Sequence, residues 1–391
     1  MAAALSISPS TVRTTDFTGS LDGLRGLLAI WVMLSHVTQF VAGPGGLITR
    51  GGIAVDLFMF VSGFLMVWTV SMRESKEPSS SIATWGKFFT RRFFRIAPLY
   101  FLLLVPAYLF DEPFLRLIEN VYAAIGQGFD RPFRQCVPST AVDVLAHLSF
   151  VFGLFPCTSS RNVLPDWSLS LEMQFYAVFP LLFLVLIRTR GAALAIFCVA
   201  LAGVAGLAQA VVGLGIIDPS RLISYPQPSI LPLRINCFVV GMALALLVWR
   251  RSPDVWLLGA LLVSLIPFQR LSFIAIGAML VLMLLARADV WLRWNASYAA
   301  PLRMVEGLLR WRVLRFCGDV SFGVYLVHLL LLLPLMTVLN GWDGFRAMSG
   351  NLKFVGVSAI AIPMVLLVAW QLHVWVEKPM IDLGRRLTSS R

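Results

Sequence analysis

The sequence predicts an all-α protein with about ten transmembrane helices and both termini in the cytoplasm. Of its 391 residues, 58% are hydrophobic and only 13% are charged, whereas a soluble domain carries about 25% charged residues. The mean hydropathy is +0.82, and the apolar residues fall in runs long enough to cross a bilayer. A transmembrane barrel would instead show alternating strands of about ten residues. The composition therefore favours a polytopic helical membrane protein.

One membrane domain is expected over residues 21–379, between cytoplasmic tails at 1–20 and 380–391, because no stretch has the composition of an added soluble domain. The first twenty residues are polar and have no apolar core, so we expect no cleaved signal peptide. Three candidate spans are shorter than a full crossing, and a merged or re-entrant segment is an alternative there. The spans are 24–42, 53–72, 166–187, 191–215, 230–249, 320–339 and 354–376, with shorter ones at 96–110, 254–268 and 271–287.

The basic residues predict the orientation of these spans. Of the 32 lysines and arginines, 22 lie on the side of the two termini. Cytoplasmic loops of membrane proteins carry such an excess, so both termini are expected in the cytoplasm. The net charge of +12 then reflects topology and contact with anionic headgroups. Nucleic acid is not an expected partner, because the basic residues are spread over short loops.

The long loop at 111–165 is expected outside the cytoplasm, and it contains Cys136 and Cys157. In an oxidising compartment these cysteines either form a disulfide or stay unpaired, and both alternatives remain open. No cysteine and histidine spacing indicates a metal site. The remaining cysteines lie in or beside spans, where small packing residues are expected: Cys198, Cys237 and Cys317.

The first span, LDGLRGLLAIWVMLSHV at residues 21–37, contains Arg25 and His36. Eleven residues of helix place their side chains within about 20° of the same face and about 16 Å apart along the axis. An interfacial arginine and a hydrogen-bonding histidine would account for the residues separately. Ionisable groups at membrane depth are usually functional, so we favour a site that uses both.

Two carboxylates are expected to enter the membrane from the outer side. Asp56 lies near the outer end of the second span, and Glu172 lies at a similar depth in PDWSLSLEMQFYAVFP, one turn before Tyr176. Carboxylates beside His36 would orient its imidazole and raise its basicity, as a catalytic cluster requires. The alternative is a buried polar network that only holds helices together.

The segment KFFTRRFFRIAPLY at 87–100 places Arg91, Arg92 and Arg95 directly before the third span. Guanidinium groups bind phosphates through paired hydrogen bonds, and the interleaved phenylalanines can cover a ring or anchor the interface. Clusters of this kind also serve only to orient a span. The segment predicts either a phosphate site or a topology signal.

Taken with CGDVSFGVYLVHLLLL at 317–332, these segments occur in the order typical of the acyltransferase-3 family, which the sequence resembles from about residue 20 to 379. The family consists of bacterial membrane O-acyltransferases that modify surface glycans. The resemblance implies that Arg25 and His36 are an essential pair. It also implies that Arg92 and Arg95, with Arg91 beside them, bind the cytoplasmic acyl-CoA.

The resemblance further implies catalytic roles for Asp56 and Glu172 next to His36. The substrate-binding residues that we infer from it are Tyr176, Ser321, Tyr325 and His328. The last three are spaced i, i+4 and i+7 on one helix face, which suits the wall of a cavity. His147 and His373 match nothing in the family, and we interpret them as a loop or interfacial residue and a packing residue.

The expected function is transfer of an acyl group, by default acetyl, from acyl-CoA to a hydroxyl of an extracytoplasmic polysaccharide or lipid-linked sugar. Acyl-CoA is then a co-substrate and no permanently bound cofactor or metal is expected. The expected location is the bacterial inner membrane. His36 acts as general base or as acyl carrier, and the base role is favoured. The alternative is a proton-coupled transporter or flippase of a glycan precursor, which also needs ionisable groups within the membrane.

Overall fold

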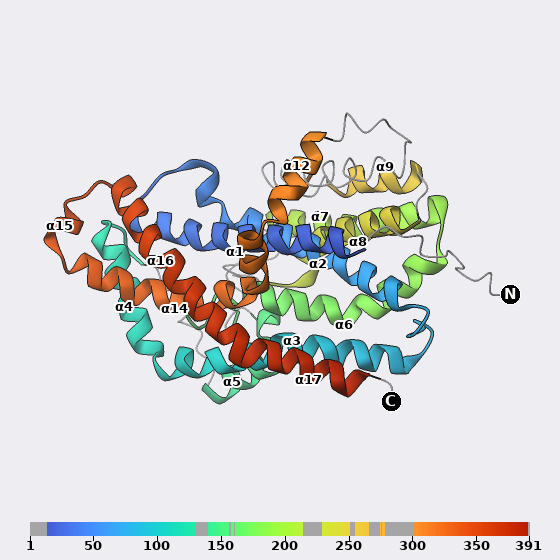
Figure 1. Ribbon diagram of the computed structural model, residues 1–391, viewed down its shortest axis with the longest axis horizontal. Helices are drawn as coiled ribbons and strands as arrows, with labels where there is room; N and C mark the ends of the chain where they lie inside the picture. Colours follow the sequence, from blue (N-terminus) through green and yellow to red (C-terminus); the bar gives the residue numbers. More distant parts are fainter. Residues whose placement is uncertain are drawn as a thin grey trace.

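The computed structural model describes residues 14–129, 140–155, 158–159, 161–213, 229–250, 255–265, 274, 276–277 and 300–389 (Figure 1). These residues form helices and turns, with no strand among them. Seven helical stretches in this part of the chain are long and apolar enough to cross a membrane. They are α1 (Thr14–Val41), α2 (Gly51–Arg73), α3 (Ile82–Leu109), α6 (Trp167–Arg188), α7 (Gly191–Gly213), α14 (Ser321–Asn340) and the stretch Gly350–Thr388.

Several shorter helices complete the described fold. The expected span at 230–249 is a 16-residue helix, α8, and the one at 254–268 is a 10-residue helix, α9. Most of the expected span at 271–287 lies outside the described residues. The total of about ten spans and the cytoplasmic termini therefore stay predictions. The shorter helices are α4 (Asp111–Ala124), α5 (Thr140–Leu148), α8 (Ile235–Arg250), α9 (Val255–Ser264), α12 (Ala300–Leu309), α13 (Arg312–Asp319) and α15 (Asp343–Arg346).

The third helix begins well before the predicted span at 96–110. α3 starts at Ile82 and continues without a break to Leu109. Its first half is amphipathic: Trp85 and Phe88 are buried, whereas the arginines between them and the apolar half are partly exposed. A hydropathy window averages such a pattern to a polar value, so the sequence prediction placed the boundary wrongly. The arginine cluster thus lies within the helix and not before it.

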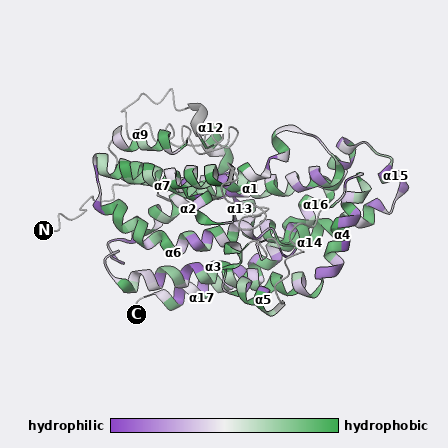
Figure 2. Cartoon of the chain, turned by 180° about the vertical axis from the view of Figure 1, so that it is seen from behind, coloured by the Kyte–Doolittle hydropathy of each residue, from purple (hydrophilic) through white to green (hydrophobic). Residues whose placement is uncertain are grey.

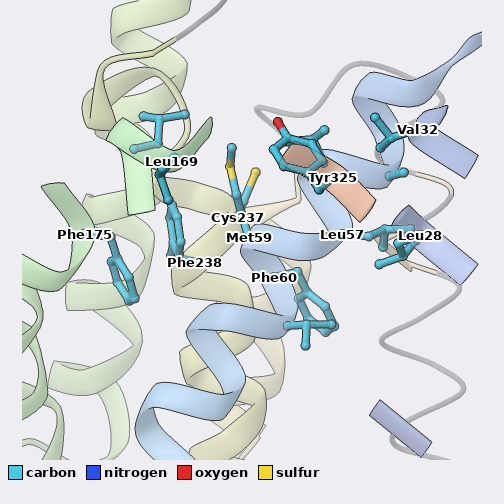
Figure 3. Close-up of a cluster of buried hydrophobic side chains, with 14 of the residues drawn as sticks. Leu28, Val32, Leu57, Met59, Phe60, Leu169, Phe175, Cys237, Phe238 and Tyr325 are labelled. Carbon is cyan, nitrogen blue, oxygen red and sulfur yellow. The ribbon is translucent and has the colours of Figure 1, made fainter. Parts of the chain in front are cut away.

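α2 packs closely against α8. A Cβ added to Gly63 of α2 would lie 2.2 Å from the carbonyl oxygen of Phe238, and one added to Gly241 of α8 would lie 2.0 Å from that of Phe60. Glycine on both sides therefore lets the two backbones approach closely, as at many interfaces within membranes. Phe175 of α6 stacks on Phe238 at 4.1 Å between ring centroids, which joins α6 to the same core (Figure 3).

Hydrophobic residues cover most of the bundle, whereas hydrophilic residues gather on α4, α15 and α17 (Figure 2). Many large apolar side chains of the spans are exposed, including Leu181 at 69% and Ile196 at 68%. Exposed apolar side chains along long helices suit contact with lipid tails. The chain is therefore a helical protein that crosses a membrane several times.

α16 (Gly350–Leu372) continues through a π-helical segment (His373–Glu377) into α17 (Lys378–Thr388). α17 runs beside α3, and the two are neighbours along their length (Figure 1). A Cβ added to Gly384 would lie 2.8 Å from the Cβ of Phe94, so this glycine permits the close approach. The residues expected as a C-terminal tail are thus helical as far as Thr388.

A polar cluster lies between α3, α5 and the start of α6. His147 is fully buried, so our interpretation of it as a loop or interfacial residue was wrong. Tyr108 Oη donates to Asp143 Oδ2 at 2.8 Å, and Tyr100 Oη donates to Asp166 Oδ2 at 2.8 Å. Burial raises the pKa of Asp143 and that of Asp166 above the usual range.

The five cysteines fall into two groups, those outside the described residues and those buried within the helices. Cys136 and Cys157 lie outside the described residues, so their pairing stays an open prediction. The other three are buried and not in disulfides, as expected for small packing residues: Cys198, Cys237 and Cys317.

Candidate active site

A cavity of about 620 Å³ lies between α1, α2, α3, α6, the end of α13, the start of α14, and α17. Its volume is in the range typical of small-molecule sites. Seven basic and four acidic side chains line it, which leaves an excess of positive charge. The basic residues are Arg25, Arg73, Arg91, Arg92, Arg95, Lys378 and Arg385, and the acidic ones are Asp22, Glu172, Asp319 and Asp382.

The three arginines of α3 are not equivalent. Arg91 donates to both carboxylate oxygens of Glu77, at 2.9 and 2.7 Å, so its charge is already paired. Arg92 lies over the rings of Phe88 and Tyr176, 5.7 and 5.6 Å from their centroids, which fixes its guanidinium against the cavity wall. Arg95 lines the same cavity one turn further along α3. Arg92 and Arg95 are therefore better placed to bind an anionic ligand than Arg91.

Arg25 enters the cavity from α1 and lies near charged groups of its own helix and of other helices. The carboxylates of Asp22, Glu172 and Glu377 attract its guanidinium, whereas Arg95 repels it. Arg25 therefore lies near both the basic residues of the cavity and the carboxylate of Glu172, which attracts it. The structure thus brings together residues that are far apart in the sequence but share the predicted function.

Glu172 is held in place by two donors. Ser62 Oγ of α2 donates to its Oε1 at 2.9 Å, and Tyr176 Oη donates to the same oxygen. Tyr176 lies one turn along α6, so its contact follows from the helix period. Ser62 is 110 residues away in the chain, and nothing in the sequence predicted its contact.

Tyr325 of α14 lies at the wall of the cavity, in contact with α6. Its hydroxyl and Ser168 Oγ are 2.7 Å apart, which joins the two helices by a hydrogen bond. Ser321, one turn earlier, also lines the cavity and donates to the carbonyl oxygen of Gly318 at 2.7 Å. Figure 3 shows Tyr325 in a cluster of buried side chains that includes residues of α1 and α2.

His36 and His328 form a pair directly behind Tyr325. The rings of Tyr325 and His328 have centroids 6.2 Å apart, and His328 Nε2 lies 3.2 Å from His36 Nδ1. His328 is completely buried, whereas His36 is partly exposed. His328, which the sequence predicted in the cavity wall with Ser321 and Tyr325, thus lies behind that wall and against His36.

Backbone contacts determine where the protons of this pair lie. His36 Nδ1 is 3.0 Å from the carbonyl oxygen of Val32, and His328 Nδ1 is 3.1 Å from that of Val324. A carbonyl oxygen only accepts, so each Nδ1 carries the hydrogen of a neutral ring. The His36 Nδ1–H is then shared between the carbonyl oxygen of Val32 and His328 Nε2, and His36 Nε2 keeps a free lone pair. This is the tautomer that a general base needs.

Asp56 lies against α8. Its Oδ1 accepts from Arg234 at 3.0 Å, and Cys237 Sγ is 3.9 Å from the same atom. This ion pair ties α2 to α8 beside their close backbone contact. The catalytic role of Asp56 stays a prediction, and its observed contact is structural.

The sequence prediction missed several residues of the site. His373 lines the cavity, so the interpretation of it as a packing residue was wrong. Its nitrogen lies 2.8 Å from the buried carboxylate of Glu377, an i, i+4 pair that the sequence displays. The other missed residues are Ser62, Ser168, Lys378 and Arg385.

Comparison with known proteins decides the family. The model described as an acyltransferase domain, that of the acyltransferase-3 family, matches residues 18–374. The chain belongs to the acyltransferase-3 family. Its relatives include acyltransferase MdmB of Streptomyces mycarofaciens, at 29% identity over 94% of this chain and 92% of that one.

Two further relatives have names that specify an acceptor. The putative peptidoglycan O-acetyltransferase YrhL of Bacillus subtilis is 25% identical over 95% of this chain and 56% of its own length. The peptidoglycan O-acetyltransferase OatA of Listeria monocytogenes is 24% identical over 82% of this chain and 50% of its own. This chain thus spans about half the length of these two relatives. No solved structure matches it.

Proposed function

We propose that this acyltransferase-3 protein transfers an acyl group, by default acetyl, from cytoplasmic acyl-CoA to a hydroxyl of an extracytoplasmic polysaccharide or lipid-linked sugar. The observation that carries the proposal is one cavity that joins a positively charged end to Glu172 and Tyr325, with the His36–His328 pair directly behind. The relatives named as peptidoglycan O-acetyltransferases support a glycan acceptor. The proposed location is the bacterial inner membrane.

The charged end of the cavity suits the donor. Coenzyme A carries its phosphates at the nucleotide end and its thioester at the end of a long pantetheine arm. Arg92, Arg95 and Arg25 supply guanidinium groups that pair with phosphate oxygens. The arm then extends toward Tyr325, which lines the same cavity.

His36 acts as general base in the proposed reaction. The acceptor hydroxyl gives its proton to His36 Nε2 while the hydroxyl oxygen attacks the thioester carbonyl carbon. The carbon–sulfur bond then breaks, and the leaving thiolate takes the proton from His36, which restores the neutral ring. His328 Nε2 accepts a hydrogen bond from His36 Nδ1–H throughout the reaction. This bond stabilises the protonated ring of His36 between these steps. In the second route, His36 Nε2 itself carries the acyl group before transfer.

Glu172 and Tyr176 complete the proposed site. Their hydrogen bond and that of Ser62 hold a carboxylate at the cavity wall, near the charge of Arg25. A fixed carboxylate at this point balances the arginines when no donor is bound. It also orients an acceptor hydroxyl through one of its oxygens.

The test is a binding and turnover measurement in detergent. The wild type, His36→Ala and an Arg92→Ala/Arg95→Ala double variant are compared for acetyl-CoA binding and for thioester cleavage with a glycan acceptor. We expect the His36 variant to bind without turnover and the double variant to bind at least tenfold more weakly, since each charged hydrogen bond is worth about 1.5–3 kcal/mol. Arg116→Ala on α4 is the matched control, because this arginine lies outside the cavity.

Failure of monodisperse wild type to bind acetyl-CoA would overturn the proposal and favour the transporter or flippase. Normal turnover by the His36 variant would also overturn the assigned chemistry. A burst of free thiol without an acceptor, equal to the enzyme concentration, would favour the acyl-histidine route over the base route.

A further inference from the structure

α17 contributes a row of side chains to the cavity although it lies beyond residue 374, where the family match ends. Lys378, Ile381, Asp382 and Arg385 all line the cavity. They are spaced i, i+3, i+4 and i+7, so they share one face of the helix. A segment that the sequence presents as a tail thus forms part of the cavity wall.

Two features fix this face toward the cavity. Gly384 lies on α17 where a Cβ would meet Phe94, so the helix is held close to α3 and its arginines. At the other end, the π-helical segment places His373 at the cavity and buries Glu377, which is only 1% exposed. π-helical segments within long helices are often found at functional sites. The position of α17 is therefore set from both ends.

The charges on this face differ from those deeper in the cavity. Arg385 is exposed over 69% of its side chain and lies 3.4 Å from Asp382, which is exposed over 43%. Lys378 adds an ammonium group, and Arg73 at the end of α2 adds a guanidinium that is 48% exposed. Arg92 lies instead against aromatic rings. The cavity thus has a partly exposed basic rim in addition to its inner arginines.

We propose that Lys378 and Arg385 of α17 bind a phosphate at the nucleotide end of the acyl donor, while the inner arginines bind the phosphates nearer the arm. This inference rests on the proposed acyl-CoA donor. An ammonium and a guanidinium on one helix face are suited to a phosphate group, and Asp382 moderates their charge. α17 therefore contributes to the specificity of the donor site because it recognises the nucleotide of the donor and not its acyl group.

The experiment measures donor affinity in detergent without anionic lipid. Lys378→Ala and Arg385→Ala should each raise the Kd of acetyl-CoA by about three- to tenfold, because exposed charged contacts are worth less than buried ones. Both effects should shrink at high salt. With acetyl-pantetheine, which lacks the nucleotide and its phosphates, the variants should equal the wild type. Arg386→Ala is the matched control, since Arg386 lies next to Arg385 but does not line the cavity.

Asp382→Asn should change the affinity for acetyl-CoA in the opposite direction, which a misfolded protein would not do. Removing this carboxylate beside Arg385 should lower the Kd of acetyl-CoA, whereas a damaged protein would bind more weakly. If the wild type binds acetyl-CoA and the two alanine variants bind it equally well, the role of α17 is overturned while the proposed function stands. An equal loss in Arg386→Ala, or an effect that appears only after phosphatidylglycerol is added, would also overturn it.

Discussion

The hydrogen bond between His36 and His328 predicts a defined loss of rate when His328 is replaced. His328→Phe keeps a ring of similar size but removes the acceptor that lies 3.2 Å from His36 Nδ1. When His36 takes the acceptor proton, this bond becomes charge-assisted and is worth about 1.5–3 kcal/mol. That free energy corresponds to a fall in kcat of about ten- to 150-fold.

The assay separates turnover from donor binding. His328 does not line the cavity, so the Kd of acetyl-CoA should stay at the wild-type value while kcat falls. His328→Gln should recover part of the rate, because its amide oxygen can accept from His36 Nδ1. In a His36→Ala background, His328→Phe should cause no further loss, since both residues act through one ring.

Two results would refute this reasoning. Unchanged kcat in His328→Phe would mean that the pair does not act in catalysis. A tenfold or greater loss of acetyl-CoA binding in the same variant would mean that His328 contacts the donor. Comparable melting temperatures of the purified variants are the control for folding.

Three further outcomes follow from the described contacts. Gly63→Ala should lower stability by about 1–3 kcal/mol, seen as a lower Tm in detergent, because its Cβ would meet the α8 backbone, whereas Gly52→Ala, with open space around it, should have little effect. Glu172→Gln should lower kcat at least tenfold while preserving the fold, because the amide oxygen still accepts from Ser62. Burial raises the pKa of Asp143 above its usual value, so the stability contributed by the protonated group is lost as pH rises through the raised pKa, and Asp143→Asn should flatten the fall in Tm as pH rises above about 4.

The Asp143 prediction involves every charged or titratable group that the carboxylate contacts. Tyr108 donates to it from α3, His147 lies 3.5 Å away on α5, and Arg161 Nε lies 3.8 Å away. Asp111 raises the pKa of Asp143 further through like charge. Asparagine keeps an oxygen that accepts from Tyr108, so the variant tests the charge and not the hydrogen bond. A variant whose Tm changes with pH as steeply as that of the wild type would contradict the assignment.

Helix periodicity accounts for what the sequence predicted well. Arg25 and His36 were expected on one face of α1, and Ser321, Tyr325 and His328 on one face of α14, because these relations depend on a single helix. The structure places Arg25, Ser321 and Tyr325 in the cavity and His36 behind it. The family was also identifiable, since its motifs are local stretches of sequence.

Contacts between helices account for what was missed. Ser168 meets Tyr325 across 157 residues, and Ser62 meets Glu172 across 110. Serine is common in membrane helices, so no local pattern marks these two as functional. Asp56 also forms an ion pair with Arg234, 178 residues away. Pairing of this kind depends on which helices pack together, which a single sequence does not reveal.

The continuous helical stretch from Gly350 to Thr388 limits which insertions and deletions the chain can accommodate. Its 39 residues extend about 58 Å at 1.5 Å per residue, against a hydrocarbon core of about 30 Å. One residue added or removed between His373 and Glu377 would rotate everything beyond by about 100°. Lys378 and Arg385 would then turn away from the cavity. An insertion or deletion at this point therefore keeps the α17 side chains facing the cavity only if it adds or removes a whole number of helical turns.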